Sequence, residues 1–276
     1  MIELGKYNLL TAARETENGV YLEDQQGREV LLPNKYVTDD LKIGDEIDVF
    51  IFNDSEDRLT ATTAKPKILL NEFAYLPVKE VTKFGAFLDW GLEKDLFVPF
   101  KEQPTKMVMG KKYVVYLYLD QQTDRLVASA NFNRFLEKDD VFVEKGEKVD
   151  LLILDATELG VNVIINNMHR GLIFNNDIFQ IIKTGDKVEG FIKNIRPDNK
   201  IDVTLQKPGF GNVEPNAQKI LEKLQNNNGF LSLTDKSDPA EITAILEMSK
   251  KTFKKAVGTL YKKKLIRLEK DGIFLV

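Results

Sequence analysis

Three segments of the chain repeat the same order of sequence features, and this repetition constrains the fold more than any other property. Each copy begins at a Gly that opens an apolar stretch, and each contains a second Gly 25 residues after the first. The paired glycines are Gly19 and Gly44, Gly85 and Gly110, and Gly160 and Gly185. Such internal repetition is typical of a chain built from copies of one structural unit.

Each copy is predicted to fold into short β-strands. In the segment 46–53, the apolar residues Ile47, Val49 and Ile51 alternate with residues of the opposite face, which is the period of two of a strand. Turn-forming pairs such as Asn18-Gly19 separate the apolar stretches. About five such strands fit one copy, and a small closed barrel would remove their exposed edges.

Aromatic residues occupy the second face of the fourth predicted strand in the first two copies. They are Phe50 and Phe52 in the first copy and Tyr116 and Tyr118 in the second. We expect these rings to pack against a neighbouring domain or helix rather than to bind a ligand.

The second copy carries a recognisable motif. Phe84-Gly85-Ala86-Phe87 is followed by Leu96–Pro99 and by Asp124-Arg125-Leu126-Val127-Ala128. This pattern resembles the OB-fold RNA-binding domain named after ribosomal protein S-one, with Pro99 where that family has His. The resemblance implies that Phe84 and Phe87 stack on RNA bases. Tyr21 stands at the position of Phe87 in the first copy and is also predicted to stack on a base, whereas Asn162 stands there in the third.

Base stacking suits aromatic side chains because every base has a π-face. Phe84 and Phe87 are three residues apart, so a regular strand would direct them to opposite sides. A bulge at Gly85 is expected to bring both to the outer face. Candidate phosphate contacts on or beside the strands are Lys83, Lys94, Arg125 and Arg28, with Lys193 and Arg196 in the third copy.

The last quarter of the chain changes from strand to helix patterns. Ala217, Ile220, Leu221 and Leu224 follow helical spacing. A short strand is predicted at 230–233, and Asp238-Pro-Ala-Glu241 is a typical helix start. Ser249 is placed to cap a third helix, and a turn at Asp271-Gly272 separates two final strands. This order of elements predicts a winged helix-turn-helix.

The third of these helices is strongly basic. Residues 208–276 hold 12 Lys and Arg against 8 Asp and Glu, although the whole chain has a net charge of −4. Lys250, Lys251, Lys254 and Lys255 are therefore candidate phosphate contacts. The helix carries no Arg, Asn or Gln for base recognition, so we expect non-specific contact. A protein contact through this helix is the alternative.

Together these features predict a mainly β chain with a small α+β end: three tandem OB-fold (S-one-like) barrels followed by a winged helix-turn-helix. The predicted limits are 1–65, 66–133, a linker helix at 134–146, 147–208 and 213–276, with Gly209-Phe210-Gly211 as a linker. This order, and the segment Ser249–Tyr261, is similar to the conserved virulence factor B family of bacteria. Membership implies RNA binding and post-transcriptional regulation of gene expression.

The amino-acid composition excludes several kinds of catalytic and metal-binding site. Cysteine is absent and His169 is the single histidine, which excludes disulfides, thiol nucleophiles and multi-histidine metal sites. His169 is interpreted as a polar loop residue. We expect no metal, no cofactor and no catalytic site, and neither a signal peptide nor a membrane span is visible. The leading hypothesis is a non-enzymatic, cytoplasmic protein with single-stranded RNA across its first two barrels. The alternatives are a DNA-binding transcription regulator and a protein-interaction scaffold.

Overall fold

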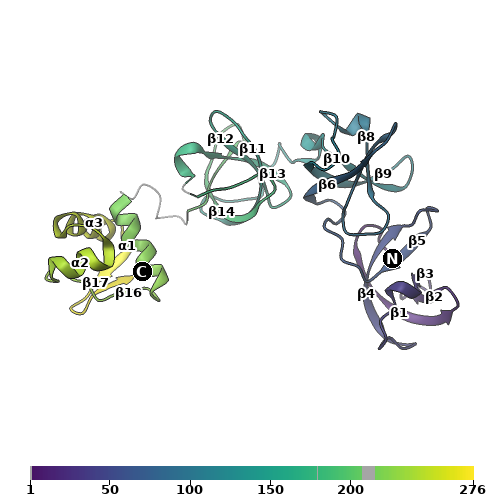
Figure 1. Ribbon diagram of the computed structural model, residues 1–276, viewed down its shortest axis with the longest axis horizontal. Coiled ribbons are helices and arrows are strands. Elements are labelled where there is room, and N and C mark those ends of the chain that lie inside the picture. The colour runs from purple at the N-terminus through teal and green to yellow at the C-terminus, as the bar shows by residue number, and fades with distance from the viewer. Residues whose placement is uncertain (1, 179, 207–214) are drawn as a thin grey trace.

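The repeated unit is a five-stranded β-sheet domain that occurs three times, and a winged helix domain follows. The computed structural model describes residues 2–178, 180–206 and 215–276 (Figure 1). The predicted linker at 209–211 lies outside the described residues. The fold is mainly β with three OB-type domains and a small α+β domain at the end, as predicted.

The first and third domains are closed barrels with the same strand order. The first closes as β1-β2-β3-β5-β4 and the third as β11-β12-β13-β15-β14. The first comprises β1 (Tyr7–Thr16), β2 (Gly19–Glu23), β3 (Glu29–Pro33), η1 (Asn34–Tyr36), β4 (Glu46–Asn53) and β5 (Leu59–Thr62). The third comprises β11 (Lys148–Ala156), β12 (Gly160–Ile165), β13 (His169–Phe174), η4 (Asn175–Asp177), β14 (Lys187–Ile195) and β15 (Ile201–Thr204).

The second domain has the same strands but is not closed by hydrogen bonds, which corrects the expectation of a closed barrel. Its sheet order is β10-β9-β6-β7-β8, so β8 and β10 form two edges. The elements are β6 (Phe73–Val81), β7 (Gly85–Leu88), β8 (Leu96–Pro99), η2 (Phe100–Glu102), β9 (Lys112–Asp120) and β10 (Arg125–Ser129). Closure is weak even in the first domain, where β3 and β5 pair only at Leu31 and Thr60. In the second domain, Arg125 at the start of β10 instead bonds to Asp57 of the first domain.

Steric contacts and backbone conformation explain why glycine occurs at the paired positions of each copy. A Cβ atom at Gly19, Gly85 or Gly160 would lie within 2.3 Å of the carbonyl oxygen of the paired strand. The second glycine of each pair has φ between 80° and 96°, a left-handed turn conformation that favours glycine. The expected bulge at Gly85 is absent, since Gly85 pairs regularly with Pro99. The register shift lies between Val78 and Glu80 instead.

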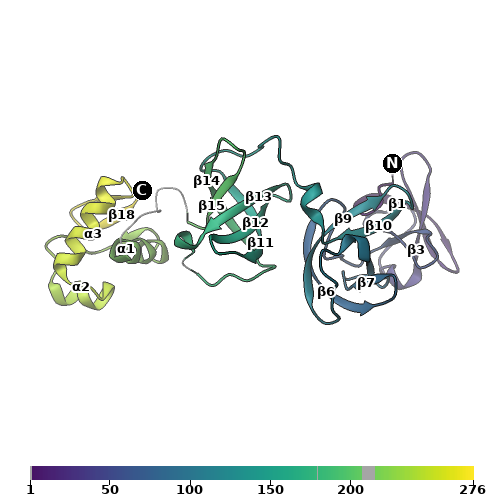
Figure 2. The same ribbon diagram turned by 90° about the horizontal axis from the view of Figure 1, so that it is seen from above.

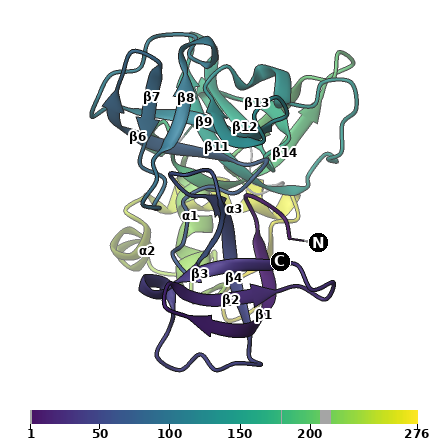
Figure 3. The same cartoon turned by 90° about the vertical axis from the view of Figure 1, so that its right-hand side faces the viewer.

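The aromatic residues of β4 join the first two domains, as predicted. Phe50 and Phe52 are almost completely buried in the core cluster of the second domain. The Phe50 ring meets the Trp90 ring edge to face at 5.8 Å between centroids. Figures 2 and 3 show the two domains lying against each other. The first two domains therefore share apolar packing.

The tyrosines of β9 make the corresponding junction with the third domain. Tyr116 is buried in one cluster with Leu152 and Ile164 of the third domain. Its ring stacks on Phe135 with 4.4 Å between centroids, and Tyr118 lies 5.1 Å from the same ring. The prediction for this aromatic pair is confirmed.

The linker helix predicted over 134–146 is wrong. Helical structure is limited to the 3-10 turn η3 (Phe132–Phe135), and residues 136–146 are irregular. The Glu137 carboxylate accepts hydrogen bonds from the backbone N–H groups of the next three residues, which competes with helix formation. Leu136 and Val143 are buried in different clusters, so the segment spans a junction rather than forming one apolar face.

His169 is also placed differently from its predicted loop. It is the first residue of β13 and is 2% exposed. Its Nε2 accepts a hydrogen bond of 3.2 Å from the Phe142 N–H, and its ring stacks on that of Phe142. It is therefore a core residue with a satisfied ring nitrogen.

The winged helix domain has its own core. It comprises α1 (Pro215–Asn226), β16 (Phe230–Leu231), α2 (Pro239–Leu246), α3 (Lys250–Lys262), β17 (Ile266–Leu268) and β18 (Ile273–Leu275). Asp238 and Ser249 cap α2 and α3 through their side chains, as the sequence predicts. One apolar cluster, drawn from this domain alone, fills the space between helices and sheet.

No helix among the described residues is long and apolar enough to cross a membrane.

Candidate nucleic-acid interface

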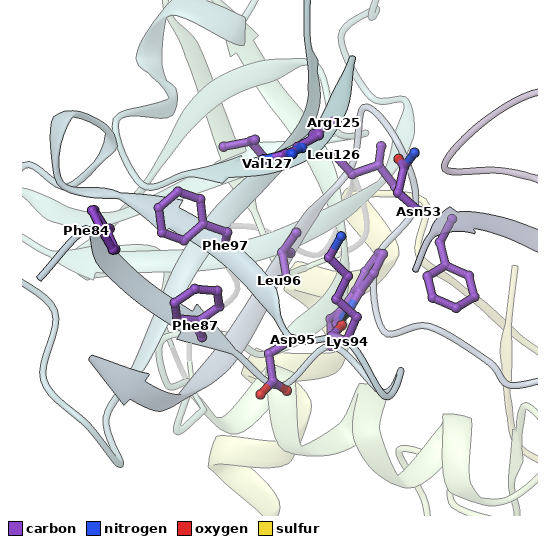
Figure 4. Close-up of a pocket in the computed structure, with 12 residues that line it drawn as sticks. Asn53, Phe84, Phe87, Lys94, Asp95, Leu96, Phe97, Arg125, Leu126 and Val127 are labelled. Atoms are coloured by element: carbon purple, nitrogen blue, oxygen red, sulfur yellow. Dashed lines mark hydrogen bonds between the residues drawn. The ribbon is translucent and has the colours of Figure 1, made fainter. Parts of the chain in front are cut away.

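A cavity of about 490 Å³ lies between the two edge strands of the second domain (Figure 4). We call it the seam groove. The residues that line it come from β7 and the turn before it, β8 and the segment before it, β10, and the end of β4 in the first domain. They are Phe52, Asn53, Phe84, Phe87, Trp90, Lys94, Asp95, Leu96, Phe97, Arg125, Leu126 and Val127. The groove thus contains four of the predicted site residues: Phe84, Phe87, Lys94 and Arg125.

Besides the buried Phe52 and Trp90, three more accessible phenylalanines supply its aromatic surface. Phe84 lies in the turn before β7 and is 66% exposed. It therefore reaches the outer face without the predicted bulge. Phe87 is half-buried on β7, between the fully buried Ala86 and Leu88. Its ring lies 5.0 Å from that of Phe97, its partner across the strand pair.

The sequence analysis did not assign Phe97 to the site. The available signal was strand alternation, because Leu96 and Val98 are buried and the residue between them must face outward. Phe97 also pairs directly with Phe87 in the β7–β8 register, and cross-strand aromatic pairs stabilise such a surface. The aromatic platform is therefore larger than predicted.

The predicted basic residues of the groove are held by the first domain. Lys94 Nζ donates to the Asp54 carbonyl oxygen at 2.6 Å and lies 3.3 Å from Asp57 Oδ1. Arg125 Nη2 donates to Asp57 Oδ2. One carboxylate of the β4–β5 turn thus pairs with both cations, and their side chains remain 34% and 55% exposed. We call this arrangement the Asp57 clamp.

Lys83 and the two predicted residues of the first domain lie outside the groove lining. Lys83 is exposed, with Nζ 5.0 Å from the centre of the Phe84 ring. The Arg14 guanidinium covers the Tyr21 ring at 3.8 Å, and Glu29 holds Arg14 through two hydrogen bonds. Arg28 bonds to the Asp24 carboxylate, and this bond lowers the pKa of Asp24. The first domain consequently presents no open ring at Tyr21.

The third domain offers a polar counterpart of this face. Asn162, at the position of Phe87, donates to Asp155 Oδ2 at 3.1 Å. Lys193 pairs with Asp177, and Arg196 pairs with Asp202. A cavity of about 430 Å³ lies nearby, with polar side chains and His169 in its lining. Among the faces compared, an uncovered aromatic face therefore occurs only in the second domain.

The basic residues of α3 do not act alike. Lys250 is half-buried and its Nζ donates to the Ser237 carbonyl oxygen at 2.7 Å, so it ties α3 to the turn before α2. Lys251, Lys254 and Lys255 are exposed on one stripe with Gly258. A Cβ atom at Gly258 would meet nothing within 4 Å. Packing within the domain thus gives no reason for a glycine there.

A buried carboxylate anchors the end of β10. Glu102 is 3% exposed and accepts hydrogen bonds from Ser129 at 2.6 Å and Arg134 at 2.8 Å. Burial opposes its ionisation, but these hydrogen bonds hold its pKa below the ordinary value. Burial, together with the charge of Glu102, raises the pKa of Tyr118 to about 12.

No group of carboxylates and histidine suited to a metal ion occurs in residues 2–178, 180–206 and 215–276.

Comparison with known proteins agrees with this architecture. Residues 4–64 and 72–131 match the S1 domain, and residues 218–275 match the CvfB-like winged helix domain. The Bacillus subtilis protein YitL is 27% identical over 94% of this chain and 89% of its own. Conserved virulence factor B of Staphylococcus saprophyticus is 25% identical over 92% of this chain and 88% of its own.

Among solved structures, a multidomain protein with nucleic acid binding domains from Streptococcus pneumoniae is 24% identical. The alignment covers 99% of this chain and 98% of that one, with a TM-score of 0.40. The S1 domain matches indicate nucleic-acid binding. The S1 domains, the CvfB-like winged helix domain and the full-length similarity to proteins of that name show that the chain belongs to the conserved virulence factor B family.

Proposed function

We propose that the protein is a non-enzymatic, cytoplasmic RNA-binding protein that binds single-stranded RNA in the seam groove and regulates gene expression after transcription. The observation that carries this proposal is the aromatic platform of Phe84, Phe87 and Phe97 beside Lys94 and Arg125. The regulatory role rests on family membership.

The groove favours a single strand over a duplex. Stacking on a side chain requires a base whose face is free, and bases inside a duplex are already stacked on each other. Phe84 is the most accessible of the three rings. Because Lys83 Nζ lies beside it, a phosphate next to the stacked base would meet a positive charge.

The path of RNA differs from the one expected from the sequence. Arg14 already covers the Tyr21 ring, so a base could stack there only after Arg14 leaves Glu29. The first domain contributes instead through Phe52 and Asn53, which line the groove of the second. We therefore place the RNA in the seam groove rather than across two equivalent outer faces.

The test compares two exposed phenylalanines. Phe84→Ala should weaken binding of a labelled single-stranded RNA by about 1–3 kcal/mol, measured by fluorescence anisotropy. Its thermal unfolding should change little, because the ring is 66% exposed. Phe142→Ala is the matched control, since Phe142 is 64% exposed but lies in the segment before β11, outside the lining of the seam groove. Equal RNA affinity for the wild type and Phe84→Ala would contradict the proposal.

A second candidate function is duplex DNA binding through α3. The exposed stripe of Lys251, Lys254 and Lys255 favours it, and Gly258 leaves room for close approach of a backbone. Competition separates the two functions: unlabelled duplex DNA should displace the RNA far less effectively than unlabelled single-stranded RNA. Stronger displacement by the duplex would favour the second function, and binding of neither would favour a protein-interaction scaffold.

A further inference from the structure

The seam groove contains a buried acceptor that no group of the protein satisfies. Among the described residues, Asn53 Oδ1 is a buried side-chain atom with no hydrogen-bond partner. Its amide nitrogen has only a long contact of 3.5 Å with the Asp57 carbonyl oxygen. An unpaired polar atom in a protein interior costs free energy, so its retention calls for an explanation.

The barrel fold does not require an amide at this position. Asn53 ends β4, nine residues after Gly44, and pairs with Leu59. The same position in the second copy is Leu119, nine residues after Gly110, which pairs with Leu126. The third copy has Asn194, which is exposed to water. Only in the first copy does the domain junction enclose the amide at this place.

Asn53 has aromatic and basic neighbours in the lining of the groove. It lines the seam groove together with Phe52, Trp90 and Lys94. Trp90 cannot satisfy it, because its indole N–H already donates to the Lys94 carbonyl oxygen at 2.6 Å. Figure 4 shows the three phenylalanines toward one end of the groove and Asn53 toward the other. A strand with one base on the phenylalanines would therefore bring a neighbouring base toward Asn53.

We propose that Asn53, contributed by the first domain, is a specificity-determining residue that accepts a hydrogen bond from the exocyclic amino group of a base bound in the seam groove. Adenine and cytosine carry such a donor, and uracil presents carbonyl oxygens at the equivalent edge positions. A carbonyl oxygen opposite Oδ1 would leave two acceptors facing each other. The site therefore prefers amino-bearing bases over uracil. This inference rests on the proposed function, because it assumes that RNA occupies the groove.

The test measures the ratio of affinities for labelled oligoadenylate or oligocytidylate and for oligouridylate of equal length. The wild type should prefer the amino-bearing oligomers by about threefold to tenfold, the range expected for one added hydrogen bond. Asn53→Leu, which installs the residue of the second copy, should bring the ratio close to one, because it removes the hydrogen bond to the amino-bearing bases and also the acceptor that opposes a uracil carbonyl oxygen. Its melting temperature should stay equal or rise, because a buried unpaired acceptor is removed.

Two further variants sharpen the result. Asn53→Asp keeps an acceptor in place, so the preference should persist while affinity for every oligomer falls through repulsion of the phosphates. Asn194→Leu makes the same change at the exposed equivalent position and should leave the ratio unaltered. A wild type without preference, an unchanged ratio in Asn53→Leu, loss of preference in Asn53→Asp, or an equal effect of Asn194→Leu would each overturn the inference.

The inference and the proposed function fail differently. If Phe84→Ala weakens RNA binding but the base preference is insensitive to Asn53, RNA occupies the groove and the assignment of Asn53 is wrong. If no single-stranded oligomer binds, or Phe84→Ala has no effect, the proposed function is wrong and the role of Asn53 falls with it.

Discussion

The Asp57 clamp should restrain RNA binding, and Asp57→Asn is the change that shows it. The carboxylate of Asp57 pairs with both Lys94 and Arg125, the two cations that line the seam groove. A phosphate that enters the groove competes with Asp57 for these partners. Removing the negative charge should therefore make both cations available to RNA.

The substitution is conformationally mild. Asp57 has φ of 61°, a left-handed conformation that Asn adopts at least as readily. The two ion pairs involve side chains that are 34–55% exposed, and exposed pairs contribute about 0–1 kcal/mol each to stability. The apolar packing of Phe50 and Phe52 still holds the two domains together. We expect the free energy of unfolding to fall by no more than about 2 kcal/mol, the upper limit for two such pairs.

The effect on RNA is measured from the salt dependence of binding. Two cations released to phosphate should steepen the slope of log K against log salt by up to about 1.4, since each contributes roughly 0.7 for a single strand. Over a fourfold change in salt, the affinity ratio of variant to wild type should shrink by up to about sevenfold. Fluorescence anisotropy titrations at several salt concentrations give both numbers.

Asp124→Asn is the matched control for the clamp. Asp124 occupies the same place in the turn of the second copy, also has positive φ, and is exposed. It changes the net charge by the same amount without opening the clamp. An unchanged slope in Asp57→Asn, or an equal change in Asp124→Asn, would refute the reasoning and leave Asp57 with a purely structural role.

Two other perturbations test separate parts of the molecule. The double variant Lys251→Ala with Lys254→Ala should reduce the salt slope of RNA binding by up to about 1.4. Lys250→Ala should mainly lower the stability of the winged helix domain, because the Lys250 Nζ bonds to a backbone carbonyl oxygen. Equal slopes in all variants would mean that α3 does not contact RNA. Glu102→Gln should flatten the acid limb of the stability curve. The pKa of Glu102 is lower in the folded state than its ordinary value, so the ionised carboxylate stabilises the protein above the ordinary pKa. This stability is lost as the pH falls through the folded pKa. Acid unfolding of the variant, measured by circular dichroism, that is as steep as that of the wild type would contradict this.

The repeat architecture could be predicted because its causes are local. Gly85 must be a glycine, since a Cβ there would meet the Val98 carbonyl oxygen at 2.3 Å. Gly110 must adopt φ of 80° to turn the chain. Such constraints recur in every copy and leave a visible period. The caps of α2 and α3 were predictable for the same reason, because Asp238 and Ser249 bond to backbone groups within three residues.

The parts that sequence analysis missed depend on contacts between distant residues. Arg125 and Asp57 are separated by 68 residues, and Lys94 and Asp57 by 37. No local pattern shows that these cations are already paired, or that Asn53 becomes enclosed at a junction. The prediction of a linker helix was wrong for a similar reason. Leu136 and Val143 have helical spacing, but they are buried in two different apolar clusters.

The three copies of the repeated unit differ at the position of the aromatic ring, and two of them form the seam groove. The stacking position is covered by Arg14 in the first domain and is an Asn bonded to Asp155 in the third. Within the part of the chain that the structure describes, only the second domain combines accessible rings with two edge strands, β8 and β10, that do not pair with each other. The first domain then supplies what the seam lacks: Phe52 as a wall, Asn53 as an acceptor and Asp57 as a counter-charge. Because these three residues lie on β4 and the turn after it, the orientation of one strand relative to the second domain sets the shape and charge of the groove together. A change at Phe50, which contacts Trp90 but does not line the groove, should therefore alter RNA binding from outside the site.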